Sequence, residues 1–229
     1  MKKFWKIMNI VYEKIIMVVF VVILLIVMYA AYDTWYVYDH ASDDSYRRFR
    51  PDRVNAAEID SPITSDMVGW IVVDDTNIDY PVMQGYDNSQ YLNLDPYGEY
   101  SLSGSIFLDS RNSSDFTDPY SIIYGHHMEY GKMFGAIDDY LDDQYLSSHR
   151  TGTLIVGRNG EKTYRLEIFY AMSTDARNEM VFDTTHYEEL RLFLENAGFV
   201  RDNRILCLST CAGDISSTRT VVFAYILEN

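Results

Sequence analysis

Apolar residues follow two different patterns along this 229-residue chain. Residues 15–32 form an 18-residue run without a charged side chain. As a helix, this run would be about 27 Å long, close to the roughly 30 Å of a bilayer's hydrocarbon core. From about residue 58 onward, short stretches rich in Val, Ile, Tyr and Phe alternate with Gly, Asn and Asp, as is typical of strands and turns. The pattern predicts one membrane-spanning helix followed by a mainly β domain.

We predict eight strands in the β region. They cover residues 70–74, 78–84, 104–109, 121–126, 151–157, 162–173, 203–210 and 218–227. So many short strands indicate a closed barrel or a sandwich. Two helices are predicted between them, over residues 129–141 and 184–198. In the second helix, Thr185 and Glu188 have the spacing of a capping box, and Gly198 is a natural C-terminal stop.

The residues that precede the apolar run are mostly basic. Four lysines, Lys2, Lys3, Lys6 and Lys14, stand against one acid, Glu13. Because basic residues favour the cytoplasmic side, this asymmetry predicts a cytoplasmic N-terminus and an exported C-terminal part. The alternative is a cleaved signal peptide, whose apolar region is usually shorter, about 7–15 residues. We therefore favour an uncleaved anchor.

The chain divides into four predicted parts. They are a cytoplasmic tail (1–14), a transmembrane anchor (15–32), a juxtamembrane stalk (33–57) and an exported domain (58–229). The formal net charge is −15, and without the tail the remaining 15 basic and 33 acidic residues give −18. This balance argues against nucleic acid as a partner, because a phosphate backbone requires a basic surface.

The candidate chemistry begins in the stretch CLSTCAGDISSTR, residues 207–219. Two predicted strands flank its loop, and a symmetric hairpin would place Cys211 opposite Arg219 with Cβ atoms about 5 Å apart. A guanidinium beside a thiol lowers the thiol's pKa and can bind a developing oxyanion. The alternative is an ordinary edge arginine paired with Asp214. Cys207, on the same strand face as Cys211, is predicted to be a small buried hydrophobic residue.

A cysteine nucleophile also needs a proton carrier. Of the five histidines, His126 and His127 lie at the end of the predicted strand 121–126, directly after a glycine. Adjacent residues in an extended chain point to opposite sides, so at most one of the two is expected to face Cys211. A histidine at a strand end is more often structural, and this pairing alone is weak evidence of catalysis.

Metal and disulfide alternatives fit the spacing less well. Cysteines spaced C-x₃-C on a strand do not form a zinc knuckle, and adjacent histidines rarely share one ion. Four residues of strand span roughly 13 Å, whereas a disulfide needs Cα atoms within about 7 Å. The acidic stretch 138–144 could bind calcium weakly, but a solvated helix face is the preferred interpretation. We expect no metal and no cofactor.

These motifs together resemble the sortases, the cysteine transpeptidases of Gram-positive surfaces. The resemblance is carried by SIIYGHHMEYGKMF (121–134), LSTC (208–211) and an arginine on the next strand. The N-terminal anchor, the helix before the cysteine strand and DNSQYLNLDPYGEYSLSGSIFLDSRN (87–112) are similar to class B in particular. The resemblance covers about residues 66–226. It implies a mainly β fold: an eight-stranded sortase-type β-barrel with added N-terminal helices and one long helix between strands 6 and 7.

The resemblance also implies catalytic roles. Cys211 would attack the backbone carbonyl of a threonine in a C-terminal sorting signal and form a thioacyl enzyme. His126 would protonate the leaving amine and later deprotonate the incoming one. Arg219 would hold the carbonyl oxygen as charge develops.

Substrate-binding positions and partners follow from the same resemblance. Class B relatives bind the sorting peptide at positions that match Asn88, Leu92 and Ser209. The implied partners are surface proteins with an LPXTG-like or NPXTN-like signal and a peptidoglycan amine acceptor, at a single-pass enzyme whose catalytic domain is extracellular. One alternative is a pilin-polymerising enzyme that uses a pilin lysine as acceptor. Another is a non-enzymatic, acidic surface-binding module.

Overall fold

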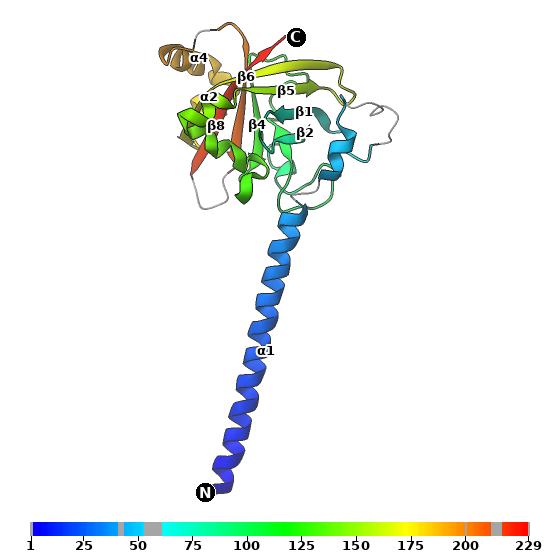
Figure 1. Cartoon of the computed structure of the whole chain (residues 1–229), viewed down its shortest axis with the longest axis vertical. Coiled ribbons are helices and arrows are strands. Elements are labelled where there is room, and N and C mark those ends of the chain that lie inside the picture. The colour runs from blue at the N-terminus through cyan, green and yellow to red at the C-terminus, as the bar shows by residue number, and fades with distance from the viewer. Residues whose placement is uncertain (1, 41–43, 53–60, 200, 212–216, 229) are drawn as a thin grey trace. The chain divides into compact units, whose positions relative to one another are not determined.

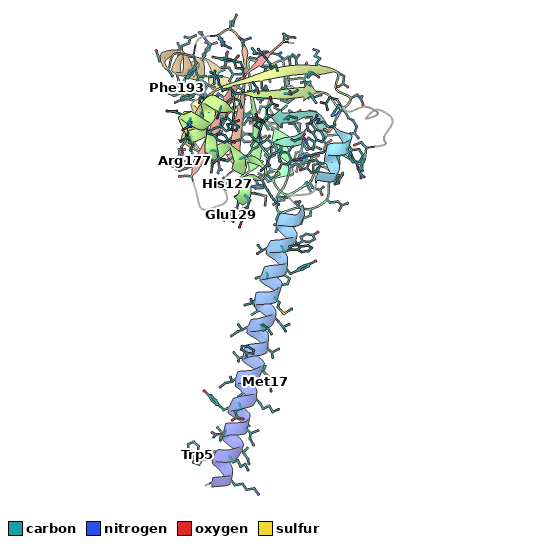
Figure 2. The ribbon with its side chains drawn as sticks, in the orientation of Figure 1. Trp5, Met17, His127, Glu129, Arg177 and Phe193 are labelled. Carbon is teal, nitrogen blue, oxygen red and sulfur yellow. The ribbon has the colours of Figure 1, made fainter. Side chains whose placement is uncertain are left out.

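The computed structural model describes residues 2–40, 44–52, 61–199, 201–211 and 217–228. The chain divides into two compact units, Met1–His40 and Ala41–Asn229. The first unit is the long helix α1 (Lys2–His40), drawn in blue in Figure 1. Its apolar side chains over the described stretch 4–36 are largely exposed, as Trp5 and Met17 are in Figure 2.

By length and composition, α1 could cross a membrane. Its segment Lys3–Tyr36 contains an 18-residue window with a mean hydropathy of 3.0, none of it buried inside the protein. The helix runs through the predicted tail and anchor without a break. The division of this region into tail, anchor and stalk stays a prediction.

The second unit is a closed barrel of eight strands, as the resemblance to sortases implies (Figure 1). The strands are β1 (Met67–Val73), β2 (Asp79–Met83), β3 (Ile106–Leu108), β4 (Tyr120–His126), β5 (Thr151–Val156), β6 (Lys162–Asp175), β7 (Arg204–Cys211) and β8 (Thr218–Leu227). Their order around the barrel is β1-β2-β3-β4-β7-β8-β6-β5. The pairs β2–β3 and β4–β7 are parallel, and the other neighbouring strands are antiparallel. The β4–β7 pair brings together two segments that are far apart in the sequence.

Short helices precede the first strand and connect the later ones. They are η1 (Asp44–Phe49), η3 (Gln90–Leu92), η4 (Glu129–Gly131), η5 (Phe134–Leu141), α2 (Asp143–Ser148), α3 (Glu179–Phe182), η6 (Thr184–His186) and α4 (Tyr187–Asn196). The last three lie between β6 and β7, where the sequence predicts a long helix. Tyr46 and Phe49 of η1 belong to the barrel core, so part of the segment predicted as a stalk packs onto the barrel.

Two local helix predictions need correction. The predicted helix 129–141 is two separate 3₁₀ segments, because Tyr130 and Met133 adopt φ angles of 60° and 50°, which an α-helix does not allow. The predicted capping box is wrong as well. The backbone N–H of Thr185 donates to the side chain of Asp183, which caps η6, and α4 follows without a side-chain cap. Gly198 has φ of +93°, consistent with the predicted helix stop.

Strand β7 is buried on both faces. Leu206 and Leu208 point into the barrel core, whereas Ile205 and Cys207 belong to a second apolar cluster with α3 and α4. This alternation is the two-residue period of a strand, and burial of both faces explains the continuous apolar sequence of β7. The helices between β6 and β7 therefore cover the outer face of the β4–β7–β8 sheet.

Candidate active site

The parallel register of β4 and β7 places His126 beside Cys211. Cα partners run in step along the two strands from Tyr120 with Ile205 to His126 with Cys211. Neighbouring strands lie about 4.8 Å apart, so the two residues are adjacent at the ends of their strands. The side chain of Cys211 lies outside the described residues.

The ring of His126 is anchored by backbone. Its Nε2 lies 2.8 Å from the carbonyl oxygen of Leu92, the last residue of η3. A carbonyl oxygen can only accept a hydrogen bond, so Nε2 is the protonated nitrogen in this arrangement. In the neutral ring, Nδ1 is then the nitrogen that can accept a proton.

Close packing leaves no room for a side chain at Gly125, the residue directly before His126. A Cβ at this position would lie 2.4 Å from Cδ1 of Ile106 and 2.8 Å from two ring atoms of Phe134. Both neighbours are buried in the barrel core. The glycine of the Gly-His pair thus lets η5 pack directly against the backbone of β4.

Arg219 lies near the start of β8, next to Thr174 on β6. The antiparallel pairing of β7 with β8 ends at Ser209 with Val221. If the same register continues by two residues, Cys211 lies opposite Arg219, as the symmetric hairpin predicts. In the described part of the chain, Nη1 of Arg219 is buried and has no hydrogen-bond partner. A buried donor without a partner is costly, so this guanidinium is suited to bind an oxygen that arrives with a ligand.

The three predicted substrate-binding residues occupy different environments. Asn88 is half-buried, and both ends of its amide are hydrogen-bonded: Nδ2 donates to Asp109 and Oδ1 accepts from the backbone N–H of Ser110. Leu92 is half-buried against the core. Ser209 is 0% exposed, and its hydroxyl donates to the carbonyl of Thr210.

His127 points to a different partner from His126. Its Nε2 lies 2.8 Å from Oδ2 of Asp138, and both side chains are about half exposed. Figure 2 labels His127 next to Glu129, in the segment that follows β4. The described contacts therefore tie His127 to the surface of η5.

Cys207 is the buried hydrophobic residue that the sequence predicts. It pairs with Phe223 on β8, as expected, and is 0% exposed. Burial raises the pKa of its thiol to about 12, although a hydrogen bond with Tyr120 acts in the opposite direction. The thiol therefore stays protonated and unreactive at neutral pH.

Two carboxylates of the acidic stretch 138–144 make structural contacts. The Asp142 side chain accepts hydrogen bonds from the N–H groups of Gln144 and Tyr145 and caps α2. Asp138 pairs with His127. The predicted alternative that pairs Asp214 with Arg219 involves a residue outside the described ranges.

The sequence analysis missed a buried carboxylate, Asp109, directly after β3. Burial alone would raise its pKa, but hydrogen bonds and the positive charge of Arg111 outweigh burial and lower the pKa below its ordinary value. The sequence signal was an Asp-x-Arg pair immediately after an apolar strand, in the stretch LDSR. Such a pair is usually an exposed turn, and sequence alone does not distinguish the two cases.

Comparison with known proteins places this barrel in a family. Residues 71–227 match the sortase domain model. The chain belongs to the sortase family. It is 38% identical over 160 residues to Sortase B of Listeria monocytogenes, covering 65% of this chain and 64% of that protein. It is 34% identical over 179 residues to Sortase B of Staphylococcus aureus, covering 72% of each.

Solved structures give the same assignment. The crystal structure of Staphylococcus aureus Sortase B complexed with MTSET superposes with a TM-score of 0.63 at 32% identity, over 73% of this chain and 75% of that one. A Streptococcus pyogenes class B sortase involved in pilus biogenesis gives 0.65 at 32% identity, over 76% of this chain and 100% of that one. The predicted class B resemblance and the eight-stranded sortase barrel are confirmed, and the matched range contains His126, Cys211 and Arg219.

Proposed function

We propose that this chain is a membrane-anchored cysteine transpeptidase that cleaves a C-terminal sorting signal after threonine and transfers the new acyl group to a peptidoglycan amine. The observation that carries the proposal is the register that sets His126 beside Cys211 at the ends of β4 and β7. Nη1 of Arg219 on the adjacent strand, which has no hydrogen-bond partner among the described residues, supports it.

The first half-reaction forms the acyl enzyme. The Cys211 thiolate attacks the threonine carbonyl carbon, and a carbon–sulfur bond forms as the carbonyl becomes an oxyanion. Arg219 donates to that oxyanion. The carbon–nitrogen bond then breaks, and His126 gives a proton to the leaving amine. The products are a thioester on Cys211 and the free C-terminal peptide.

The second half-reaction reverses these roles. His126 takes a proton from the acceptor amine as the amine attacks the thioester. The carbon–sulfur bond breaks, the Cys211 thiolate is regenerated, and a new amide joins the protein to the acceptor. The sorting signal itself, LPXTG-like or NPXTN-like, would bind along the segment that carries Asn88 and Leu92 and near Ser209 of β7, two residues before Cys211.

A second acceptor has specific support. The Streptococcus pyogenes relative, described as involved in pilus biogenesis, is covered over its full length by the match to this chain. A pilin lysine as acceptor would use the same three catalytic residues. The two acceptors give different products: single conjugates with peptidoglycan fragments, or ladders of one protein.

The proposed location is the outer face of the cell membrane. Helix α1 would span the membrane once, with the basic N-terminal end in the cytoplasm and the barrel outside. Protease added to intact cells would digest the barrel and leave a cell-protected N-terminal fragment. Complete protection of the barrel would contradict this orientation.

The decisive test uses the full chain purified in detergent and a panel of sorting-signal peptides. Intact mass is recorded with and without hydroxylamine. We expect an acyl adduct on Cys211 that hydroxylamine releases as a hydroxamate. Cys211→Ala should abolish the adduct, and the matched control Cys207→Ala should retain it. Cleavage by Cys211→Ala would refute Cys211 as the nucleophile. No adduct with any peptide would favour the surface-binding module.

A further inference from the structure

Asp109 is a fully buried carboxylate with five hydrogen bonds. Oδ1 accepts from the backbone N–H of Arg111 at 2.9 Å and from its Nε at 2.9 Å. Oδ2 accepts from Nη2 of Arg111 at 2.8 Å, from Nδ2 of Asn88 at 2.9 Å and from the hydroxyl of Tyr124 at 3.0 Å. A buried charge is tolerated only when it is paired and hydrogen-bonded in this way.

The Asp109–Arg111 pair connects three segments around the catalytic strands. Asn88 precedes η3, whose Leu92 holds the ring of His126. Tyr124 lies on β4 two residues before His126. On the other side, Nη2 of Arg111 donates at 2.6 Å to the carbonyl of Phe182, at the end of α3. One ion pair thus joins the Asn88 segment, strand β4 and the connection between β6 and β7.

The network also fixes which way the amide of Asn88 points. The backbone N–H of Ser110 can only donate and lies 2.7 Å from Oδ1 of Asn88. The ionised carboxylate of Asp109 can only accept, and it takes one of the two Nδ2 hydrogens. The other Nδ2 hydrogen has no partner among the described residues. Asn88 therefore has one N–H that can donate a hydrogen bond to a ligand.

We propose that Asp109 and Arg111 are positioning residues that hold the free N–H of Asn88 toward a backbone carbonyl of the sorting peptide. This inference rests on the proposed transpeptidase function. Arg111 acts by locking the carboxylate that orients Asn88 and by holding the Phe182 segment close to the same carboxylate. Neither residue reacts with the peptide itself.

The chain contains a matched control for this ion pair. Asp175 and Arg177 repeat the same Asp-x-Arg geometry, with hydrogen bonds of 2.9 Å, 3.0 Å and 3.2 Å. The side chain of Arg177, labelled in Figure 2, is 86% exposed. In the described part of the chain, its side-chain hydrogen bonds go to Asp175 alone. Removing the Arg177 guanidinium therefore breaks an equivalent local ion pair but disconnects no other segment of the described chain.

The test measures kcat and KM separately for peptide cleavage by the full chain in detergent. Arg111→Met should raise KM about fivefold, the effect of roughly one hydrogen bond, with a smaller change in kcat. Arg177→Met should leave KM unchanged. Because Arg111 is proposed to act through Asn88, Arg111→Met should have little further effect on KM in an Asn88→Ala background.

Several outcomes would overturn the proposal. They are an unchanged KM for Arg111→Met, an equal rise for Arg177→Met, or a full additional rise in the Asn88→Ala background. If Arg111→Met does not fold, Arg111→Lys replaces it, because lysine keeps the charge but cannot bridge the carboxylate and the Phe182 carbonyl as the guanidinium does. Absence of any acyl adduct in the wild-type chain would instead refute the transpeptidase function, and the positioning role with it.

Discussion

Replacement of Gly125 by alanine tests whether packing at the Gly-His pair supports the site. The new methyl group would overlap Cδ1 of Ile106 at 2.4 Å and the ring of Phe134 at 2.8 Å. Ordinary contacts of this kind are about 3.5–4.0 Å, so each neighbour must retreat by roughly 1 Å. The end of Ile106 can rotate, but Phe134 is fully buried and its contacting atoms lie close to the backbone.

We expect Gly125→Ala to lower the free energy of unfolding by about 1–3 kcal/mol, the usual cost of an extra methyl group in a filled core. The displaced β4 backbone should also reduce kcat, because it carries His126. Urea unfolding of the full chain in detergent gives the first quantity, and peptide cleavage gives the second. A double-mutant cycle separates the overlap from other effects of alanine.

Ile106→Val supplies the second half of that cycle. It removes Cδ1, the nearest atom, and alone should cost about 0.5–1.5 kcal/mol. In the Gly125→Ala background, the same change relieves overlap, so the double variant should be more stable than the sum of the single effects by at least about 0.5 kcal/mol. Strict additivity, or a Gly125→Ala protein as stable as the wild type, would refute the packing argument.

Three further predictions concern charge and reactivity. Arg219→Lys should lower kcat by about 10²–10³-fold with a smaller change in KM, because a lysine lacks the guanidinium donors that we assign to the oxyanion; equal changes in kcat and KM would contradict this role. In a Cys211→Ala chain, Cys207 should resist an alkylating reagent at about pH 8 and react in urea, since its buried thiol has a pKa of about 12; intact mass would detect labelling of the folded protein, which would contradict its burial. Because the pKa of Asp109 is lower in the folded chain than in the unfolded chain, ionised Asp109 stabilises the fold above the unfolded pKa of about 3.9. This stabilisation is lost as the pH falls through the folded pKa. The difference in unfolding free energy between the wild type and Asp109→Asn should therefore shrink below about pH 4, and a constant difference would be inconsistent with an ionised Asp109.

The strands were predictable because their burial follows a simple period. In β7, alternate residues enter two different apolar clusters, so the stretch is apolar on both faces and is bounded by polar residues. The prediction of one helix over 129–141 was wrong for the opposite reason. The sequence of this segment favours one continuous helix, but Tyr130 and Met133 adopt positive φ angles that interrupt it, and the backbone of Gly135 lies so close to Met128 that a Cβ there would overlap the Met128 carbonyl. Local pattern does not contain that information.

Only part of the candidate site could be predicted from the sequence. A hairpin is local, so loop length predicts the Cys211–Arg219 arrangement, and the described β7–β8 register up to Ser209 and Val221 has the alignment that this prediction requires. The pairing of His126 with Cys211 is parallel and joins strands 85 positions apart in register, so only the resemblance to sortases predicted it. Neither the local sequence pattern nor the resemblance to sortases predicted a role for Asp109. Its Asp-x-Arg pair has the same local hydrogen bonds as Asp175 and Arg177, and the difference between a buried junction and an exposed turn comes only from the segments that close over it. The two Asp-Arg pairs have the same local hydrogen bonds but differ in burial. Matched substitutions of Arg111 and Arg177 can therefore distinguish a positioning role from a local ion pair.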